Sequence, residues 1–297
     1  MPHQPVERYF SATGARLCYF EWGPPGAPAI FLIHATGFHA RCWDETINAL
    51  PESFRVIAVD MRGHGRSEKT GPMPDWTVPA KDIGELVAHL EIEDAIGAGH
   101  SMGGHTLVQA AAARGKTFKR LVLIDPVMMS PEIYASPSPW PKGVEHPVAR
   151  RRNYWASWQE MFDAFKTRNP YSLWRPQVLA DYCRYGLLPK ASGGGFELAC
   201  PPAVEASIYT GSTGTNIYAL ARSIDKPVLV VRARQRDPGA PRDYTDFSAS
   251  PTWAGVAATF AQGRDLYLPE FTHFIPMQDP ELTAELVLDE VAAGGRR

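Results

Sequence analysis

The sequence predicts a doubly wound α/β fold, with a mostly parallel eight-stranded sheet and a helical segment inserted into it. Continuous apolar runs recur along the chain and alternate with stretches of helical periodicity, which is typical of parallel strands that helices cover on both faces. One of these runs ends in a tight turn at residues 99–103, where glycines flank a serine, and an alanine-rich helical stretch follows directly. A long aromatic-rich interval then interrupts the alternation, which indicates an insertion.

The chain begins with two strand patterns that we expect to pair as an antiparallel lead-in, at residues 7–10 and 15–22. Six further apolar runs predict the parallel strands of the sheet, at residues 28–34, 54–60, 95–99, 120–125, 227–232 and 265–268. Between them, apolar residues at helical spacing predict helices at residues 41–50, 80–90, 102–113, 253–262 and 280–292.

The alternation stops between the runs at 120–125 and 227–232. This interval has no buried-strand pattern but carries helical stretches around residues 148–166, 175–185 and 202–209, crowded with aromatic residues. We interpret residues 128–223 as a helical cap inserted into a core formed by residues 1–127 and 224–297. Most of its aromatic side chains are expected to hold the cap helices together, and a minority to face a pocket between cap and sheet.

Composition narrows the class of protein. The 297 residues are 44% hydrophobic and include 30 basic and 32 acidic side chains without a basic block, so we expect neither a nucleic-acid nor a membrane partner. The first residues have no signal-peptide layout. The four cysteines are scattered without a Cys-x-x-Cys pair, so we expect no zinc site or disulfide framework and a reduced, cytoplasmic protein. The oligomeric state is left open.

Four motifs occur in an order that is informative as a set. They are Gly-His-Ser-Met-Gly at 99–103, His-Ala-Thr-Gly-Phe at 34–38, Asp-Met-Arg-Gly-His-Gly-Arg-Ser at 60–67, and Thr-His-Phe-Ile-Pro-Met-Gln-Asp-Pro at 272–280. In these motifs the chain resembles the cap-bearing branch of the α/β-hydrolase fold superfamily, a carboxylesterase-like serine hydrolase. The resemblance covers nearly the full length.

The resemblance implies a catalytic serine, Ser101. Because a serine hydroxyl is a poor nucleophile at neutral pH, it needs a base and a carboxylate that orients the base, and His273 is the candidate base. The order serine, acid, histidine leaves Asp125, Asp237, Asp243 and Asp246 as the acid. Asp237 is favoured because residues 230–237 resemble the family's strand and loop, although Ala233 stands where a glycine is usual. Asp125 is the alternative, since some members of the superfamily draw the acid from the preceding strand.

Two backbone N–H groups, those of Met102 and Thr36, are the predicted oxyanion hole. Ala35 replaces the glycine that is usual in this loop, and the Thr36 hydroxyl is either a further donor or a support of the loop. The candidate substrate-binding residues are Phe38, His100, Met128, Met129 and Trp140.

The resulting hypothesis is a cofactor-independent, metal-free serine hydrolase that cleaves a carboxylic ester of a small, apolar or aromatic molecule through an acyl-enzyme. A lactonase or a carbon–carbon bond hydrolase would use the same triad, and perhydrolase or haloperoxidase-like activity is a lesser alternative. Hormone receptors of the same fold keep the triad, so a ligand-binding receptor is the alternative of another class.

Overall fold

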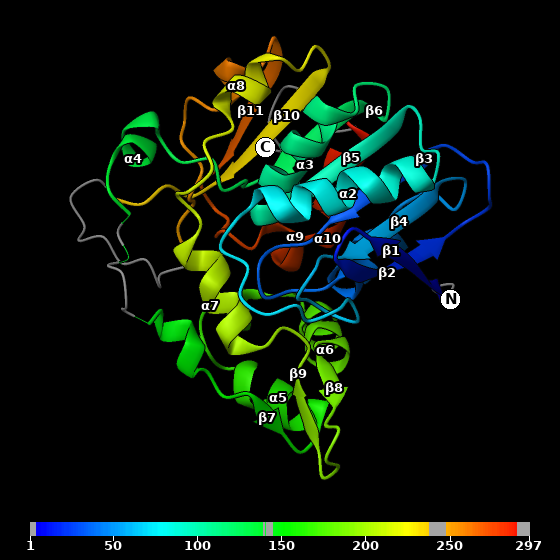
Figure 1. Ribbon diagram of the computed structural model, residues 1–297, viewed down its shortest axis with the longest axis vertical. Coiled ribbons are helices and arrows are strands. Elements are labelled where there is room, and N and C mark those ends of the chain that lie inside the picture. Colours follow the sequence, from blue (N-terminus) through cyan, green and yellow to red (C-terminus); the bar gives the residue numbers. More distant parts are fainter. Residues whose placement is uncertain (1–3, 139, 141–144, 238–247, 290–297) are drawn as a thin grey trace.

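The computed structural model describes residues 4–138, 140, 145–237 and 248–289. Its main sheet has eight strands in the order β1-β2-β4-β3-β5-β6-β10-β11. Both pairings of β2 are antiparallel and the remaining pairings are parallel, which confirms the predicted fold class (Figure 1). The strands are β1 (Val6–Ala12), β2 (Ala15–Trp22), β3 (Ala29–Ile33), β4 (Arg55–Asp60), β5 (Ala95–His100), β6 (Phe118–Ile124), β10 (Pro227–Ala233) and β11 (Gln262–Leu268).

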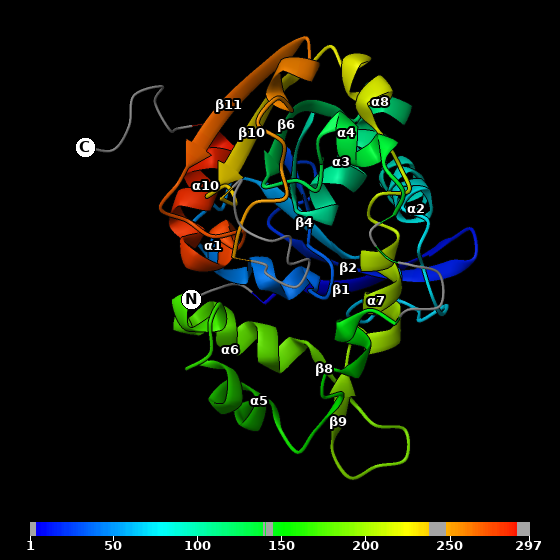
Figure 2. The ribbon, with the colours of Figure 1, turned by 90° about the vertical axis from the view of Figure 1, so that its left-hand side faces the viewer.

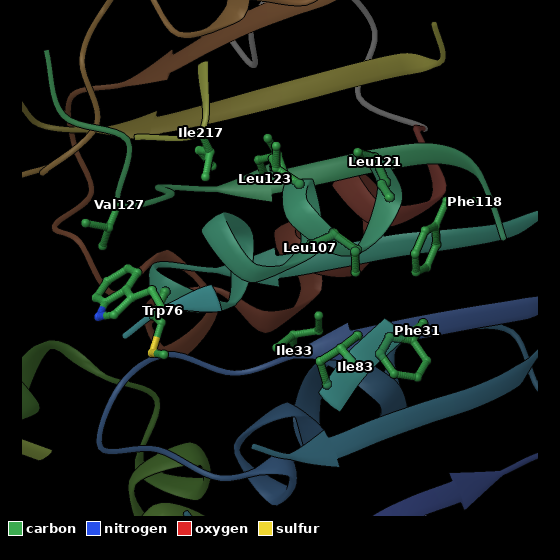
Figure 3. Close-up of a cluster of buried hydrophobic side chains, with 14 of the residues drawn as sticks. Phe31, Ile33, Trp76, Ile83, Leu107, Phe118, Leu121, Leu123, Val127 and Ile217 are labelled. Atoms are coloured by element: carbon green, nitrogen blue, oxygen red, sulfur yellow. The ribbon is translucent and has the colours of Figure 1, made fainter. Parts of the chain in front are cut away.

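Helices cover both faces of this sheet. In β3, Phe31 and Ile33 belong to the apolar cluster under α2 (Thr77–His89) and α3 (Met102–Ala113), which Figure 3 shows. Ile30 and Leu32, which alternate with them, pack on the opposite face. That face is covered by the 3-10 helix η1 (Ala40–Trp43), α1 (Asp44–Asn48) and α10 (Pro280–Leu288), which follows the short α9 (Ile275–Gln278) (Figure 2). Burial on both faces explains why the parallel strands are continuous apolar runs.

One predicted core helix is wrong. Residues 253–262 form only the 3-10 turn η4 (Ala257–Thr259), and Gln262 already pairs with Pro227 at the start of β11. The Trp253 N–H donates to the Met128 carbonyl oxygen at 2.9 Å, so this segment is anchored to the sheet instead of closing helical turns. Tertiary hydrogen bonding thus outweighs the local helix propensity of its alanines.

Between β6 and β10 lies the region that the sequence analysis interprets as a cap. It contains short helices and a small antiparallel sheet in the order β7-β9-β8, which the sequence analysis did not predict. The expected helical stretch at 148–166 is divided between the 3-10 helix η2 (Pro147–Arg150), the strand β7 (Tyr154–Trp155) and the helix α5 (Trp158–Phe165). The elements are α4 (Pro131–Ala135), η2 (Pro147–Arg150), β7 (Tyr154–Trp155), α5 (Trp158–Phe165), η3 (Tyr171–Leu173), α6 (Pro176–Tyr185), β8 (Leu187–Pro189), β9 (Phe196–Leu198), α7 (Pro202–Thr210) and α8 (Tyr218–Arg222).

One part of this inserted region extends away from the main sheet, and another part packs against the core. The elements from β7 to β9 extend away from the main sheet, whereas α8 packs with α3 in the core, where Tyr218 and Ala221 join the cluster that contains Leu107 (Figures 1 and 2). The helical layer over the sheet therefore resumes within the 128–223 interval, before β10 begins.

Helix α7 connects the inserted region to the loops at the sheet edge. Its carbonyl oxygen at Ile208 accepts a hydrogen bond from Trp76 Nε1 at 2.9 Å, and the Glu205 carboxylate forms a 2.7 Å ion pair with Arg151. A side chain at Gly37 would lie 2.5 Å from the Glu205 carboxylate, so α7 lies directly against the loop after β3. Among the described residues, no helix combines the length and apolar character needed to cross a bilayer.

Candidate active site

The turn at Ser101 joins β5 directly to α3. Its backbone is strained, with φ of 57° and ψ of −120°, values that ordinary residues rarely adopt. The flanking glycines permit this, because a Cβ at Gly99 would lie 2.4 Å from the Gly103 carbonyl oxygen and one at Gly103 would lie 2.3 Å from that of Ile33. The turn therefore presents the Ser101 hydroxyl at the carboxyl edge of the sheet.

His273 lies between Ser101 and a buried carboxylate. Its Nε2 is 3.0 Å from Ser101 Oγ, and its Nδ1 is 2.6 Å from Asp125 Oδ2. Because an ionised carboxylate can only accept, Nδ1 carries the proton and Nε2 is left with the lone pair that faces the serine. The structure thus brings the predicted nucleophile and base together in a productive tautomer.

The carboxylate behind His273 belongs to Asp125 and not to Asp237, so the preference for Asp237 is wrong. Asp125 follows β6, is fully buried, and receives the Ala233 N–H at 2.9 Å and the Ser250 hydroxyl on its Oδ1. β10 continues to Ala233 and places that N–H against Asp125, whereas Asp237 lies beyond the strand and is exposed. Asp243 and Asp246, the other two contenders, lie outside the described residues.

The loop after β3 carries Thr36 and lies against the start of α3. The Thr36 hydroxyl is 3.3 Å from Met102 Sδ, so the two predicted oxyanion residues are neighbours. Met102 is the first residue of α3, and its N–H therefore has no acceptor within the helix. The helix dipole further favours negative charge at this end.

Two buried histidines hold this loop in place. His64 Nε2 accepts the Gly37 N–H at 3.0 Å, and His34 Nε2 accepts the Met61 N–H at 3.0 Å. Burial lowers the pKa of His64 to about 4 and that of His34 well below its ordinary value, so both rings are neutral at pH 7 and can accept. The histidines of the motifs at 34–38 and 60–67 therefore support the backbone of Thr36.

Ser101, Thr36 and His273 line a cavity of about 350 Å³. Phe38, Met129 and Trp140, three of the predicted substrate-binding residues, line it. Further lining side chains come from both the sheet region and the inserted region: Trp76, Val127, Ser130, Ile133, His146, Tyr209, Ser212, Gln235, Arg236, Ser250, Thr252, Trp253 and Phe274.

His100 and Met128, the other two predicted substrate-binding residues, do not line the cavity. In the extended segment after β6 the side chains alternate, so Val127 and Met129 face the cavity while Met128 is fully buried in the sheet core. His100 is fully buried as well, and its Nε2 donates to the His273 carbonyl oxygen at 2.8 Å. His100 thus contacts the backbone of the base, and its prediction as a substrate contact is wrong.

Several site residues were missed by the sequence analysis. Ser250 and Thr252 approach Asp125 from a segment more than a hundred positions away in sequence, and no local motif marks them. His146 and Tyr209, which also line the cavity, are not among the residues that the motifs mark as site candidates. In the described parts of the chain, no group of three or more His, Cys, Asp or Glu side chains is arranged to hold a metal ion.

Comparisons with known proteins identify the family of the chain. A model described as the alpha/beta hydrolase family matches residues 30–286. The chain is 39% identical over 92 residues to a bifunctional esterase/perhydrolase of Acinetobacter calcoaceticus, and 34% identical over 125 residues to a non-heme chloroperoxidase of Streptomyces lividans. These matches cover 31% and 40% of the chain and 33% and 45% of the respective relatives, so the chain matches less than half the length of either.

Solved structures match over almost the whole chain. The structure of E-2-(acetamidomethylene)succinate hydrolase aligns with a TM-score of 0.77 at 20% identity, covering 97% of this chain and 100% of that one. An enol-lactonase of Burkholderia xenovorans aligns with a TM-score of 0.66 at 22% identity, covering 95% and 98%. At such low identity these likenesses establish the fold.

Proposed function

The chain belongs to the alpha/beta hydrolase family, as the resemblance of its four motifs predicts, and from this premise we propose that it is a serine hydrolase acting on carboxylic esters. The observation that carries the proposal is the buried line from Ser101 Oγ through His273 to Asp125, which ends at the wall of a cavity. A serine, a base and an orienting carboxylate in hydrogen-bond contact are the arrangement that activates a hydroxyl for acyl transfer.

In the acylation step, Ser101 Oγ attacks the ester carbonyl carbon while its proton passes to His273 Nε2. The carbonyl oxygen becomes negatively charged and would be met by the backbone N–H groups of Met102 and Thr36. Asp125 remains ionised and stabilises the imidazolium, whose Nδ1–H it already accepts. When the intermediate collapses, His273 gives its proton to the departing alkoxide and the acyl group stays on Ser101.

In the deacylation step, a water molecule enters the cavity and loses a proton to His273 Nε2 as it attacks the acyl carbon. The second intermediate uses the same two N–H donors. Its collapse returns the proton to Ser101 Oγ and releases the carboxylic acid, so the residues end in their starting state.

The cavity favours a small substrate with apolar or ring-containing parts. At about 350 Å³ it lies near the lower end of small-molecule sites, and Trp76, Trp140, Trp253 and Phe274 contribute aromatic surface to its wall. This supports the proposed substrate class and leaves the individual ester open.

Three other reactions would proceed through the same acyl-enzyme: lactone hydrolysis, carbon–carbon bond cleavage, and perhydrolysis. The name of the matched Acinetobacter calcoaceticus relative includes perhydrolase activity, which makes perhydrolysis the first of these to test. Incubation with an ester and hydrogen peroxide, followed by measurement of peracid, separates it from plain hydrolysis.

The test of the proposal is the rate of p-nitrophenyl ester hydrolysis by the wild type and by Ser101→Ala, together with labelling by a fluorophosphonate. We expect the wild type to hydrolyse the ester and to be labelled, and the folded variant to do neither. Retention of ester hydrolysis by folded Ser101→Ala would contradict the proposal. An inert wild type whose melting temperature still rises with a ligand would support the receptor alternative instead.

A further inference from the structure

His146 is a buried polar side chain of the cavity that the proposed mechanism does not use. It lies in the inserted region, is only 2% exposed, and lines the same cavity as Ser101. Its ring centroid is 4.3 Å from that of Trp140 and 5.0 Å from that of Tyr209, and the Tyr209 ring lies nearly parallel to it at 17°. These aromatic contacts fix the plane of the imidazole.

A backbone contact fixes which nitrogen carries the proton. The Val148 N–H donates to His146 Nδ1 at 3.2 Å, so Nδ1 is an acceptor without a proton. Burial lowers the pKa of His146, which keeps the ring neutral at pH 7. A neutral imidazole whose Nδ1 accepts must carry its proton on Nε2, so His146 has an N–H donor on the ring edge that Val148 leaves open.

This donor has no partner within the described residues. Nε2 takes part in no hydrogen bond there, and it is not among the described side-chain atoms that are wholly enclosed without a partner, so it stays accessible from the cavity that His146 lines. An accessible N–H without a protein partner is open to an acceptor on a bound molecule, and one such hydrogen bond gives a modest net stabilisation. The cavity is the space from which such an acceptor can come.

We propose that His146 Nε2–H donates a hydrogen bond to a neutral carbonyl oxygen of the substrate, remote from the bond that is cleaved. The inference rests on the proposed function and makes the substrate an ester with a second, ketone- or amide-like carbonyl. A neutral donor among aromatic rings brings no positive charge to offset the desolvation of a carboxylate, so a neutral acceptor fits this position better. Trp140 and Tyr209 give the neighbouring part of the substrate an apolar surface.

The test uses substrates that differ by one carbonyl group. We would measure kcat/KM for p-nitrophenyl hexanoate and for its 4-oxo and 5-oxo analogues. In the wild type, kcat/KM for at least one oxo ester is expected to exceed that of the hexanoate by about fivefold, the effect of one net hydrogen bond. His146→Phe keeps a ring between the aromatic neighbours and lacks the donor, so the ratio should fall to about one.

Two further variants make the result specific. His146→Gln places an amide N–H near the position of Nε2 and should give a ratio between those of the wild type and His146→Phe. His89→Phe makes the same substitution on the exposed face of α2, where His89 stacks on Phe10, and should keep the wild-type ratio. If circular dichroism shows that His146→Phe is unfolded, the ratios of the wild type and of His146→Gln test the inference.

Two results would overturn the inference: a wild-type ratio of about one for both oxo esters, or a raised ratio that survives in His146→Phe at its full wild-type value. Fluorophosphonate labelling of the same samples separates this failure from failure of the proposed function. A labelled, active enzyme without the oxo preference contradicts only the role of His146, whereas an unlabelled, inactive wild type contradicts the proposed function.

Discussion

The two walls of the cavity are held together by different forces. On the sheet side, Ser101, His273 and Asp125 form directional hydrogen bonds with each other and with backbone groups of neighbouring strands. On the inserted side, the ring of His146 contacts the rings of Trp140 and Tyr209. Directional bonds fix the positions of reacting atoms, whereas apolar contacts select shape and can adapt. Changes in the sheet wall should therefore reduce kcat, and changes in the inserted wall should alter KM or substrate preference.

The largest expected effect comes from the acid of the sheet wall. Asp125→Asn replaces a carboxylate, which can only accept hydrogen bonds, with an amide that can donate to His273 Nδ1. The ring proton would then lie on Nε2, the nitrogen that must act as the base. We expect kcat for a p-nitrophenyl ester to fall by about 10⁴. Asp237→Asn makes the same chemical change at an exposed position and should keep kcat within about twofold. The reverse order of the two effects would contradict the assignment of Asp125.

The next effect belongs to the inserted wall. Trp140→Ala removes aromatic surface from the cavity without touching the hydrogen-bonded line to Ser101. Loss of one large apolar contact should raise KM for an aromatic ester by about tenfold, with a much smaller change in kcat. Steady-state kinetics with a phenyl-bearing and a short aliphatic ester would show it. A loss confined to kcat would remove the distinction between the two walls.

A smaller effect concerns stability at low pH. His64, which supports the Thr36 loop, has a pKa lowered by burial from 6.5 to about 4. Between these values the unfolded chain binds more protons than the folded one, so the free energy of unfolding should fall as the pH falls from 6.5 towards 4. Urea unfolding at pH 7 and pH 5 measures this loss, and His64→Gln should show less of it. An equal loss in wild type and variant would mean that His64 makes no contribution.

The inserted region contains a side chain whose contribution to stability depends on pH in the opposite direction. Burial, with Asp44 and Glu45 nearby, raises the pKa of Asp181 on α6 from 3.8 to about 7. Its contribution to stability is therefore present at low pH and is lost as the pH rises through 7. Asp181→Asn should lose more stability than the wild type on acidification from pH 7 to pH 4, and should be the more stable of the two above pH 7. The free energy of unfolding, measured with urea at each pH, decides between these outcomes. The same dependence on pH in both proteins would contradict the prediction.

The difference between the walls also explains what the sequence could predict. Parallel strands buried on both faces leave continuous apolar runs, so all eight strands of the sheet and the positions of Ser101 and His273 at its edge could be predicted. The acid could not be decided, because Asp125 and Asp237 follow adjacent strands and only the three-dimensional register of β6 and β10 shows which carboxylate meets His273.

The inserted wall was less predictable for a physical reason. Aromatic residues of this region have similar spacing in the sequence whether they face the cavity or the interior, so Tyr209 and His146 carry no distinguishing pattern. The pair Met128 and Met129 shows the same limit at single-residue scale. In an extended chain, neighbouring side chains point to opposite sides, so Met129 reaches the cavity and Met128 does not. Because both residues are methionines, their chemistry does not distinguish them.

Acylation of Ser101, with His273 and Asp125 behind it, can be observed by trapping the acyl-enzyme. The wild type would be mixed with a p-nitrophenyl ester and the reaction quenched with acid within the first turnovers. The protein would then be digested for peptide mass spectrometry. We expect to find the acyl group on Ser101 of the wild type, and we expect it to accumulate more slowly in Asp125→Asn but not in Asp237→Asn. Steady ester hydrolysis without any acyl group on Ser101, and with the same rate in folded Ser101→Ala, would contradict this expectation.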